Sequence, residues 1–170
     1  MDCTLRPWRL EDADDLAAAL NDRQVLDNLR DGLPFPYTPA DARAFLTAML
    51  ESDPCRTFAF AIVAEGRAVG SMGVFRQENI HFRTAEMGYY IARPCWGRGL
   101  ATSAVRQTCD YIFQNTDILR IFAQPLARNA ASCRVLEKAG FALEGILRQN
   151  AVKNGRIEDM KLYARLRQSP

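Results

Sequence analysis

The sequence predicts a single domain of the mixed α/β class, and three observations lead to that prediction. The chain has 170 residues, which is the usual length of one domain. Apolar runs typical of strands alternate along it with runs that favour helices. Two pairs of apolar runs are joined by hairpin-length turns, which indicates antiparallel neighbours. We therefore treat residues 1–170 as one domain.

The N-terminal part is predicted to hold one strand and three helices. TLRPWRL is a candidate strand at a sheet edge, because Pro7 has no N–H to donate to a neighbour. Glu11–Leu20 is acidic early and alanine-rich later, which favours a helix, and Asp22–Arg30 is expected to form a second, short one. After the loop DGLPFPYTP, Thr38 caps a third helix that runs to about Ser52.

Strands and helices alternate through the rest of the chain. In order, we expect strands at TFAFAIVA, AVGSMGVF and Ala85–Ala92, a helix at Arg98–Gln114, a strand at ILRIFAQ, a helix at Asn129–Ala139, and strands at FALEGILRQNAV and RIEDMKLYARL. The turns Glu65-Gly66-Arg67 and Lys153-Asn154-Gly155 predict two hairpins. Gly140 is typical of the position just past a helix end.

Composition excludes several classes of function. The chain is 48% apolar and 25% charged, as in ordinary soluble domains, and 22 basic against 20 acidic residues argue against nucleic acid or an anionic membrane as the main partner. The N-terminal stretch lacks the apolar segment of a signal peptide, and no run is long enough to span a bilayer, so we expect a cytoplasmic protein. Five widely spaced cysteines and one histidine predict reduced thiols and no metal site.

The run CWGRGLA, residues 95–101, joins a predicted strand to a predicted helix. Its glycines allow backbone N–H groups to converge, and the helix that follows adds unpaired N–H groups and the positive end of its dipole. Such a turn suits a phosphate or pyrophosphate. It matches neither of two well-known phosphate loops: there is no GxxxxGK[ST], and Thr102 stands where GxGxxG needs its third glycine. A simple strand-to-helix turn explains the glycines equally well.

The loop belongs to a longer pattern. AEMGYYIARPCWGRGLATSAV followed by NAASCRVLEKAGFALEGILR resembles the Gcn5-related N-acetyltransferase (GNAT) superfamily, in particular the Rim-type branch that acetylates protein N-termini and small amines. The resemblance extends from LRPWRLEDADDL to KLYARL, nearly the whole chain. It implies a mostly antiparallel central sheet, flanked by helices, in which the strands near 85–92 and 118–124 splay apart around acetyl-CoA. It also implies direct attack by a primary amine, either a protein N-terminal α-amine or a small molecule. A homodimer is common in the family, and the hairpin around Lys153 is a candidate contact.

The resemblance also implies a set of cofactor-binding residues. The backbone amides of residues 96–102 would hold the pyrophosphate, and three strand residues would pair by main chain with the pantetheine arm. Asn129 would face the pantetheine or the acetyl end, and Arg93 or Arg98 would reach the nucleotide phosphates. The full set is Tyr90, Ile91, Ala92, Trp96, Gly97, Arg98, Gly99, Leu100, Ala101, Thr102 and Asn129.

Acetyl transfer to an amine needs a base, an oxyanion donor and an acid for the thiolate. Glu86 is the candidate base, because it is a carboxylate in an apolar strand whose burial would raise its pKa, and it can act through a water; a salt bridge or solvent exposure is the alternative. An irregular strand around Gly88 would expose an oxyanion donor near residues 87–89. Ser132, one helical turn from Asn129, is the candidate acid, since Rim-type members similarly have a serine here; a helix cap and a small first-turn residue are the alternative.

The sequence departs from the family at positions that bear on the chemistry. Leu136 stands where many members have a tyrosine acid, and Ala151 where some ribosomal-protein acetyltransferases have a glutamate base. Phe35 and Tyr37, in the PFPY loop, are candidates for lining the amine pocket. Two rival functions remain open at this point: a non-catalytic sensor that binds CoA or acyl-CoA, and an unrelated phosphate-ligand module built on the same turn.

Overall fold

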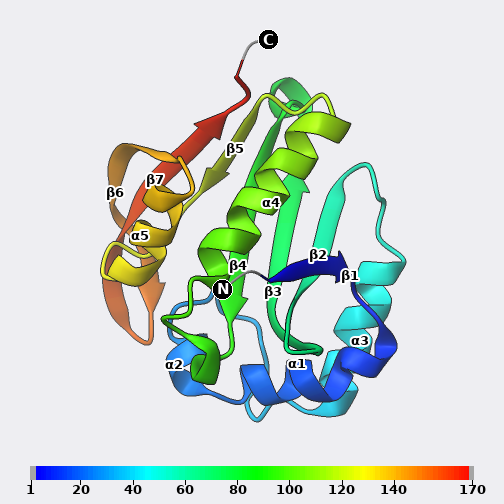
Figure 1. Ribbon diagram of the computed structural model, residues 1–170. Coiled ribbons are helices and arrows are strands. Elements are labelled where there is room, and N and C mark those ends of the chain that lie inside the picture. Colours follow the sequence, from blue (N-terminus) through cyan, green and yellow to red (C-terminus); the bar gives the residue numbers. More distant parts are fainter. Residues whose placement is uncertain (1–2, 169–170) are drawn as a thin grey trace.

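The computed structural model describes residues 3–168. These residues form one seven-stranded sheet in the order β1-β2-β3-β4-β5-β7-β6, with helices on both faces (Figure 1). The strands are β1 Thr4–Pro7, β2 Thr57–Ala64, β3 Arg67–Arg76, β4 Thr84–Ile91, β5 Arg120–Ala123, β6 Ala142–Lys153 and β7 Arg156–Leu166. The helices are α1 Ala13–Leu20, α2 Arg23–Leu26, α3 Pro39–Leu50, α4 Leu100–Asn115 and α5 Ala130–Lys138, with 3-10 turns η1 Leu10–Asp12, η2 Asn79–His81 and η3 Arg93–Cys95.

The predicted fold class is confirmed. Neighbouring strands are antiparallel throughout, except that β4 and β5 are parallel. The predicted order of elements is also observed, with differences at helix ends. The first helix is divided into η1 and α1, and the helix expected over residues 22–30 extends only over Arg23–Leu26. The long helix begins at Leu100 rather than Arg98, because Gly99 is left-handed, with φ of 78°, and serves as its N-cap.

Sheet edges follow the prediction for Pro7. This residue ends β1, which pairs only with β2 and forms one edge of the sheet. An edge strand tolerates proline because one side of it needs no N–H donor. The two predicted hairpins are also formed, with Glu65, Gly66, Asn154 and Gly155 at positive φ in their turns.

Two apolar clusters cover the two faces of the sheet. The larger packs α4 and α5 against one face, and the smaller packs α1, α2 and α3 against the other. Figure 1 shows α4 crossing one face of the sheet, with α5 beside β6 and β7. Since side chains alternate along a strand, β4 serves both clusters: Met87 and Tyr89 pack on the α4 side, and Tyr90 packs on the other.

The parallel pair β4 and β5 separates after three residues. Thr84, Ala85 and Glu86 pair with the first residues of β5, and within residues 3–168 no strand pairs with Met87–Ile91 on that side. The predicted splay between these two strands is therefore present, and it leaves one side of half of β4 without a strand neighbour.

Candidate active site

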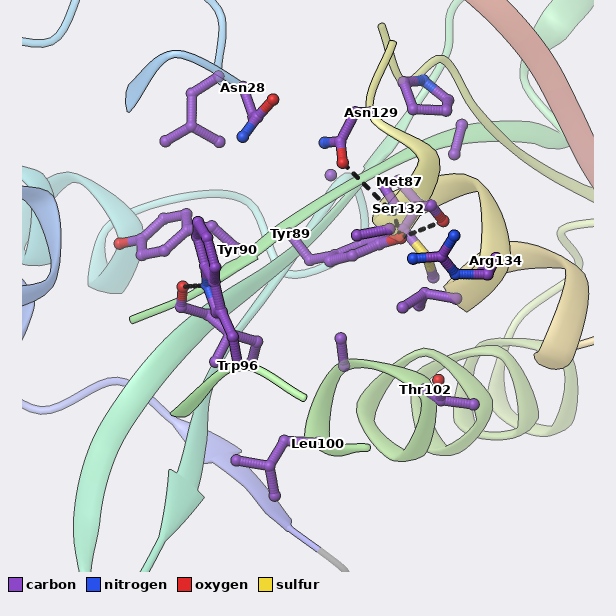
Figure 2. A pocket seen from close by; sticks show the side chains of 18 of the residues that line it. Asn28, Met87, Tyr89, Tyr90, Trp96, Leu100, Thr102, Asn129, Ser132 and Arg134 are labelled. Carbon is purple, nitrogen blue, oxygen red and sulfur yellow. Dashed lines mark hydrogen bonds between the residues drawn. The ribbon is translucent and has the colours of Figure 1, made fainter. Parts of the chain in front are cut away.

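A cavity of about 610 Å³ occupies the splay. It lies between β4, the N-terminal ends of α4 and α5, and the segment that follows α2 (Figure 2). Most of the predicted site residues line it, namely Glu86, Tyr90, Ile91, residues 96–102, Asn129 and Ser132. Three predicted residues, Phe35, Tyr37 and Ala92, do not line it.

The main chain of β4 offers its hydrogen-bonding groups to the cavity at every second residue. The Ala92 N–H donates to the Val69 carbonyl at 2.8 Å, so even-numbered residues of β4 bond to β3 and odd-numbered ones face away. The main-chain pairing expected for Tyr90 and Ala92 is therefore wrong, while Ile91 has the predicted orientation. Tyr89, which was not in the predicted set, shares that orientation.

The predicted irregularity at Gly88 is absent. The β3–β4 register runs without a shift from Gly70↔Ile91 to Arg76↔Ala85. No bulge is needed to expose an N–H donor, because strand alternation directs odd-numbered N–H groups of β4 away from β3, and Tyr89 lies beyond the last pair with β5, so its N–H faces the splay. An oxyanion donor in the predicted stretch thus follows from the separation of β5.

The glycine loop presents main-chain donors at the start of α4. The first amide to bond within the helix is that of Ser103, which donates to the Gly99 carbonyl at 3.1 Å, so the amides of residues 100–102 precede the helical ladder. Gly97 and Gly99 both have positive φ, and a side chain at either position would enter open space. The Trp96 amide, which was expected to act as a donor, instead bonds to the Arg93 carbonyl at 3.1 Å.

The Trp96 side chain takes a role that the sequence did not suggest. Its indole Nε1 donates to the Ile91 carbonyl at 2.7 Å, which ties the glycine loop to the end of β4 (Figure 2). The Ile91 carbonyl oxygen keeps a second lone pair for another donor. The two arginines near the loop are engaged in exposed ion pairs, Arg93 with Asp22 and Arg98 with Glu65. Exposed ion pairs contribute little to stability, so Asp22 and Glu65 compete only weakly with a phosphate for these two guanidinium groups.

Asn129 and Ser132 meet at the start of α5. The Asn129 side chain is the N-cap of α5 and accepts from the Ser132 amide at 3.2 Å. The helix cap that the sequence analysis gave as the alternative is therefore present. The Ser132 hydroxyl lies 2.9 Å from the Tyr89 hydroxyl, which reaches it from β4. Burial raises the pKa of Tyr89 above its ordinary value, so this phenol stays protonated. A pair of hydroxyls therefore stands at the wall of the cavity.

Glu86 is less isolated than the sequence suggested. Its side chain is 22% exposed and forms an ion pair with Arg30, whose side chain is 72% exposed. The alternative of a salt-bridged carboxylate is thus present. Arg30 lies on the segment after α2, and both residues line the cavity, so the ion pair stands at its mouth. A partner as exposed as Arg30 is held weakly.

The two aromatic residues of the PFPY loop lie outside the cavity. Tyr37 is only 3% exposed and packs in the smaller core cluster with Trp8 and Leu46, so core packing replaces the expected substrate contact. Phe35 is 45% exposed, and the guanidinium of Arg23 lies 4.2 Å from its ring centroid. Neither position supports the predicted contact with an acceptor amine.

Several cavity residues were missed by sequence analysis. Among them are Asn28, Arg30, Tyr89, Arg134 and Lys138. Arg134 and Lys138 are one helical turn apart on α5, a spacing that is visible in the sequence and would have signalled a basic face. Figure 2 shows Arg134 beside Ser132, across from Thr102 at the start of α4.

Other kinds of site find no support in the part of the chain that the structure describes. None of the five cysteines forms a disulfide, and no group of three or more histidine, cysteine, aspartate or glutamate side chains is arranged to hold a metal ion there. Between residues 3 and 168, no helix has the length and apolar character to cross a membrane.

Two features define the class of this protein: the parallel strands β4 and β5 splay apart, and the cavity between them has main-chain donors from β4 and from the first turn of α4. Residues 2–142 match the family model described as an acetyltransferase (GNAT) domain. The chain therefore belongs to the GNAT acetyltransferase family, and the predicted family and enzyme class are confirmed.

Individual relatives agree with this membership. Over 115 residues the chain is 38% identical to a probable N-acetyltransferase of Bacillus subtilis, YjcK, a match that covers 68% of this chain and 64% of that protein. Its fold is similar to the ribosomal-protein-S5-alanine acetyltransferase of Vibrio fischeri, with a TM-score of 0.85, 25% identity, and 96% and 92% of the two chains covered. The same TM-score relates it to Mycobacterium smegmatis RimJ in complex with CoA-disulfide, at 27% identity over 95% and 80% of the chains. The resemblance to Rim-type proteins thus holds in structure as well as in sequence.

Proposed function

We propose that this chain transfers the acetyl group of acetyl-CoA to a primary amine by direct attack. The observation that supports this most strongly is the splay of β4 and β5, which places free main-chain groups of β4 and first-turn amides of α4 along one continuous cavity. A long ligand with a peptide-like arm and a pyrophosphate matches those two sets of donors.

The donor set fits acetyl-CoA residue by residue. The amides of Leu100, Ala101 and Thr102, with the positive end of the α4 dipole, would hold the pyrophosphate. The main chain of Tyr89 and Ile91 would pair with the pantetheine arm. Arg134 and Lys138 add positive charge to the same wall of the cavity, which suits a ligand that carries several phosphates.

The remaining cavity residues would perform the chemistry. Bound acetyl-CoA supplies a thioester whose carbonyl oxygen gains negative charge when an amine attacks. The β4 amide of Tyr89, which lies beyond the last pair with β5, would stabilise this charge. Glu86 would take the proton of the amine, directly or through a water, once Arg30 has moved from it. Ser132 would donate a proton to the departing thiolate.

The acceptor class is a protein N-terminal α-amine or a small-molecule amine. The related structures include enzymes of both kinds, since one is named for ribosomal protein S5 alanine and another is a spermidine N-acetyltransferase of Vibrio cholerae. Only Glu86 provides a carboxylate among the described residues that line the cavity, which favours an acceptor with a single ammonium over a polyamine. Ribosomal N-terminal peptides are therefore the first acceptors to test.

Thermal unfolding with acetyl-CoA, CoA and ATP in parallel tests the cofactor site. At 100 times its dissociation constant, a ligand should stabilise the protein by about 2.7 kcal/mol. Acetyl-CoA and CoA should raise the midpoint and ATP should not; a shift with ATP alone would favour the phosphate-ligand module. Thiol release is then followed with a panel of N-terminal peptides, amino acids and polyamines. A protein that binds acetyl-CoA and turns over no amine would be the non-catalytic sensor.

A further inference from the structure

Tyr89 and Ser132 form a hydroxyl pair inside the cavity. The Tyr89 phenolic oxygen lies 2.9 Å from Ser132 Oγ and 3.3 Å from the Ser132 carbonyl oxygen (Figure 2). The two residues are 43 positions apart, on β4 and on the first turn of α5, so the fold alone brings them together. Both line the cavity at the end where α5 begins.

The direction of this hydrogen bond follows from the chemistry of the two hydroxyls and from the distances: the phenol also donates to the Ser132 carbonyl oxygen at 3.3 Å, but the Ser132 Oγ at 2.9 Å is the nearer acceptor. A phenol is a far stronger acid than an aliphatic alcohol, so it is the better donor, and the alcohol oxygen is the better acceptor. With the Tyr89 proton directed at Ser132 Oγ, the serine proton is free to point elsewhere. A donated bond also polarises the acceptor hydroxyl and makes its own proton a stronger donor.

We propose that Tyr89 is a positioning residue for Ser132: its hydroxyl donates to Ser132 Oγ and turns the serine proton toward the sulfur of the leaving thiol. This inference rests on the proposed acetyl transfer. It gives Tyr89 a part in a site where Leu136 stands in place of the family's usual tyrosine, and it brings the phenol from β4, across the cavity from α5.

The transfer step balances with Tyr89 unchanged. The amine nitrogen forms a bond to the acetyl carbon, the carbon–sulfur bond breaks, and its electron pair stays on sulfur. The nitrogen loses one proton to Glu86, and sulfur gains one from Ser132. Solvent returns a proton to Ser132 and removes one from Glu86, so the net products are an amide and a thiol. Tyr89 keeps its proton and only holds the serine in place.

Steady-state kinetics of four variants test this role. Tyr89→Phe removes the hydroxyl and keeps the ring, and we expect kcat to fall about tenfold while KM for acetyl-CoA changes less than twofold. Ser132→Ala should lower kcat at least as far. The double variant should be no slower than Ser132→Ala, because a positioning residue has no effect once its target is gone.

Tyr163→Phe is the matched control. Tyr163 is a fully buried tyrosine whose hydroxyl lies 2.7 Å from Glu137 Oε1, and it does not line the cavity. This variant loses a buried tyrosine hydrogen bond, as Tyr89→Phe does, and its kcat should stay at the wild-type value. A fall in kcat in both variants would assign the Tyr89 effect to general stability and overturn the inference.

Other outcomes are equally decisive. The positioning role is overturned if Tyr89→Phe keeps the wild-type kcat. It is also overturned if the fold-loss in kcat of the double variant equals the product of the two single losses. Either result leaves the proposed function intact. Wild-type protein without turnover on any amine overturns the proposed function, and this inference with it.

Discussion

Replacing Gly97 with alanine should weaken acetyl-CoA binding by more than the backbone strain of the substitution can explain. Gly97 has φ of +75°, and an added Cβ would meet no atom within 4 Å. Gly155, in the β6–β7 turn, has φ of +74° and equally open surroundings. The two substitutions therefore impose the same backbone strain, but only Gly97 lines the cavity. Gly155→Ala is its matched control.

The expected magnitudes follow from these geometries. A left-handed alanine costs about 1 kcal/mol, so each variant should melt roughly 3 °C below the wild type without ligand. At 100 times its dissociation constant, acetyl-CoA adds about 2.7 kcal/mol, or roughly 8 °C. A Cβ in the phosphate cradle should weaken affinity at least tenfold, which reduces the ligand contribution to about 1.4 kcal/mol, or roughly 4 °C.

Thermal unfolding at one fixed acetyl-CoA concentration measures both quantities, and isothermal calorimetry confirms the affinities. Gly155→Ala should keep the full ligand shift, and Gly97→Ala should keep no more than about half of it. Equal ligand shifts in the two variants would refute the assignment of the pyrophosphate to this loop. A lowered shift in both would show that strain at any such turn loosens the whole domain.

Three further predictions concern the candidate base, the core and an ion pair. Glu86→Gln should lower kcat by at least tenfold and leave the acetyl-CoA thermal shift unchanged, as measured by thiol release and unfolding; unchanged kcat would remove Glu86 from the chemistry. Leu136→Ala should cost about 2–5 kcal/mol in urea unfolding, because Leu136 is fully buried between α5 and the sheet. The Arg6 guanidinium beside Asp12 lowers the pKa of that carboxyl below its ordinary 3.8. The pair's stabilisation is therefore present above pH 3.8, and the advantage of the wild type over Asp12→Asn should vanish in urea titrations as pH falls through the lowered pKa.

Local chemistry explains what the sequence predicted well. Turn residues such as Lys153-Asn154-Gly155 determine a hairpin within a few positions, and Pro7 marks an edge strand by what it lacks. The glycine loop and the capping Asn129 act on their own neighbours in the chain. Each of these is a short-range property, so a single sequence is enough to reveal it.

Contacts between distant residues explain what the sequence did not show. Arg30 meets Glu86 across 56 positions, and Tyr89 meets Ser132 across 43. The burial of Tyr37 depends on how α1 and α3 pack, which its own loop does not reveal. The wrong prediction for Tyr90 has another cause. Successive residues of a strand direct their main-chain groups to opposite neighbours, and the register with β3, which decides whether Tyr90 or Ile91 faces the splay, is not visible in the sequence.

The end of β5 explains why the cavity exists where it does. β5 has only four residues, and Pro125 soon follows it, a residue that cannot donate to a parallel ladder. The chain beyond Pro125 stays beside β7, since the Pro125 carbonyl accepts from the Lys161 amide and Leu126 bridges to Met160. β4 continues with β3 and β5 continues with β7, so the two strands diverge, and Tyr89 and Ile91 have no strand partner on the β5 side. The free main-chain groups that a long ligand needs are therefore a consequence of where one short strand ends.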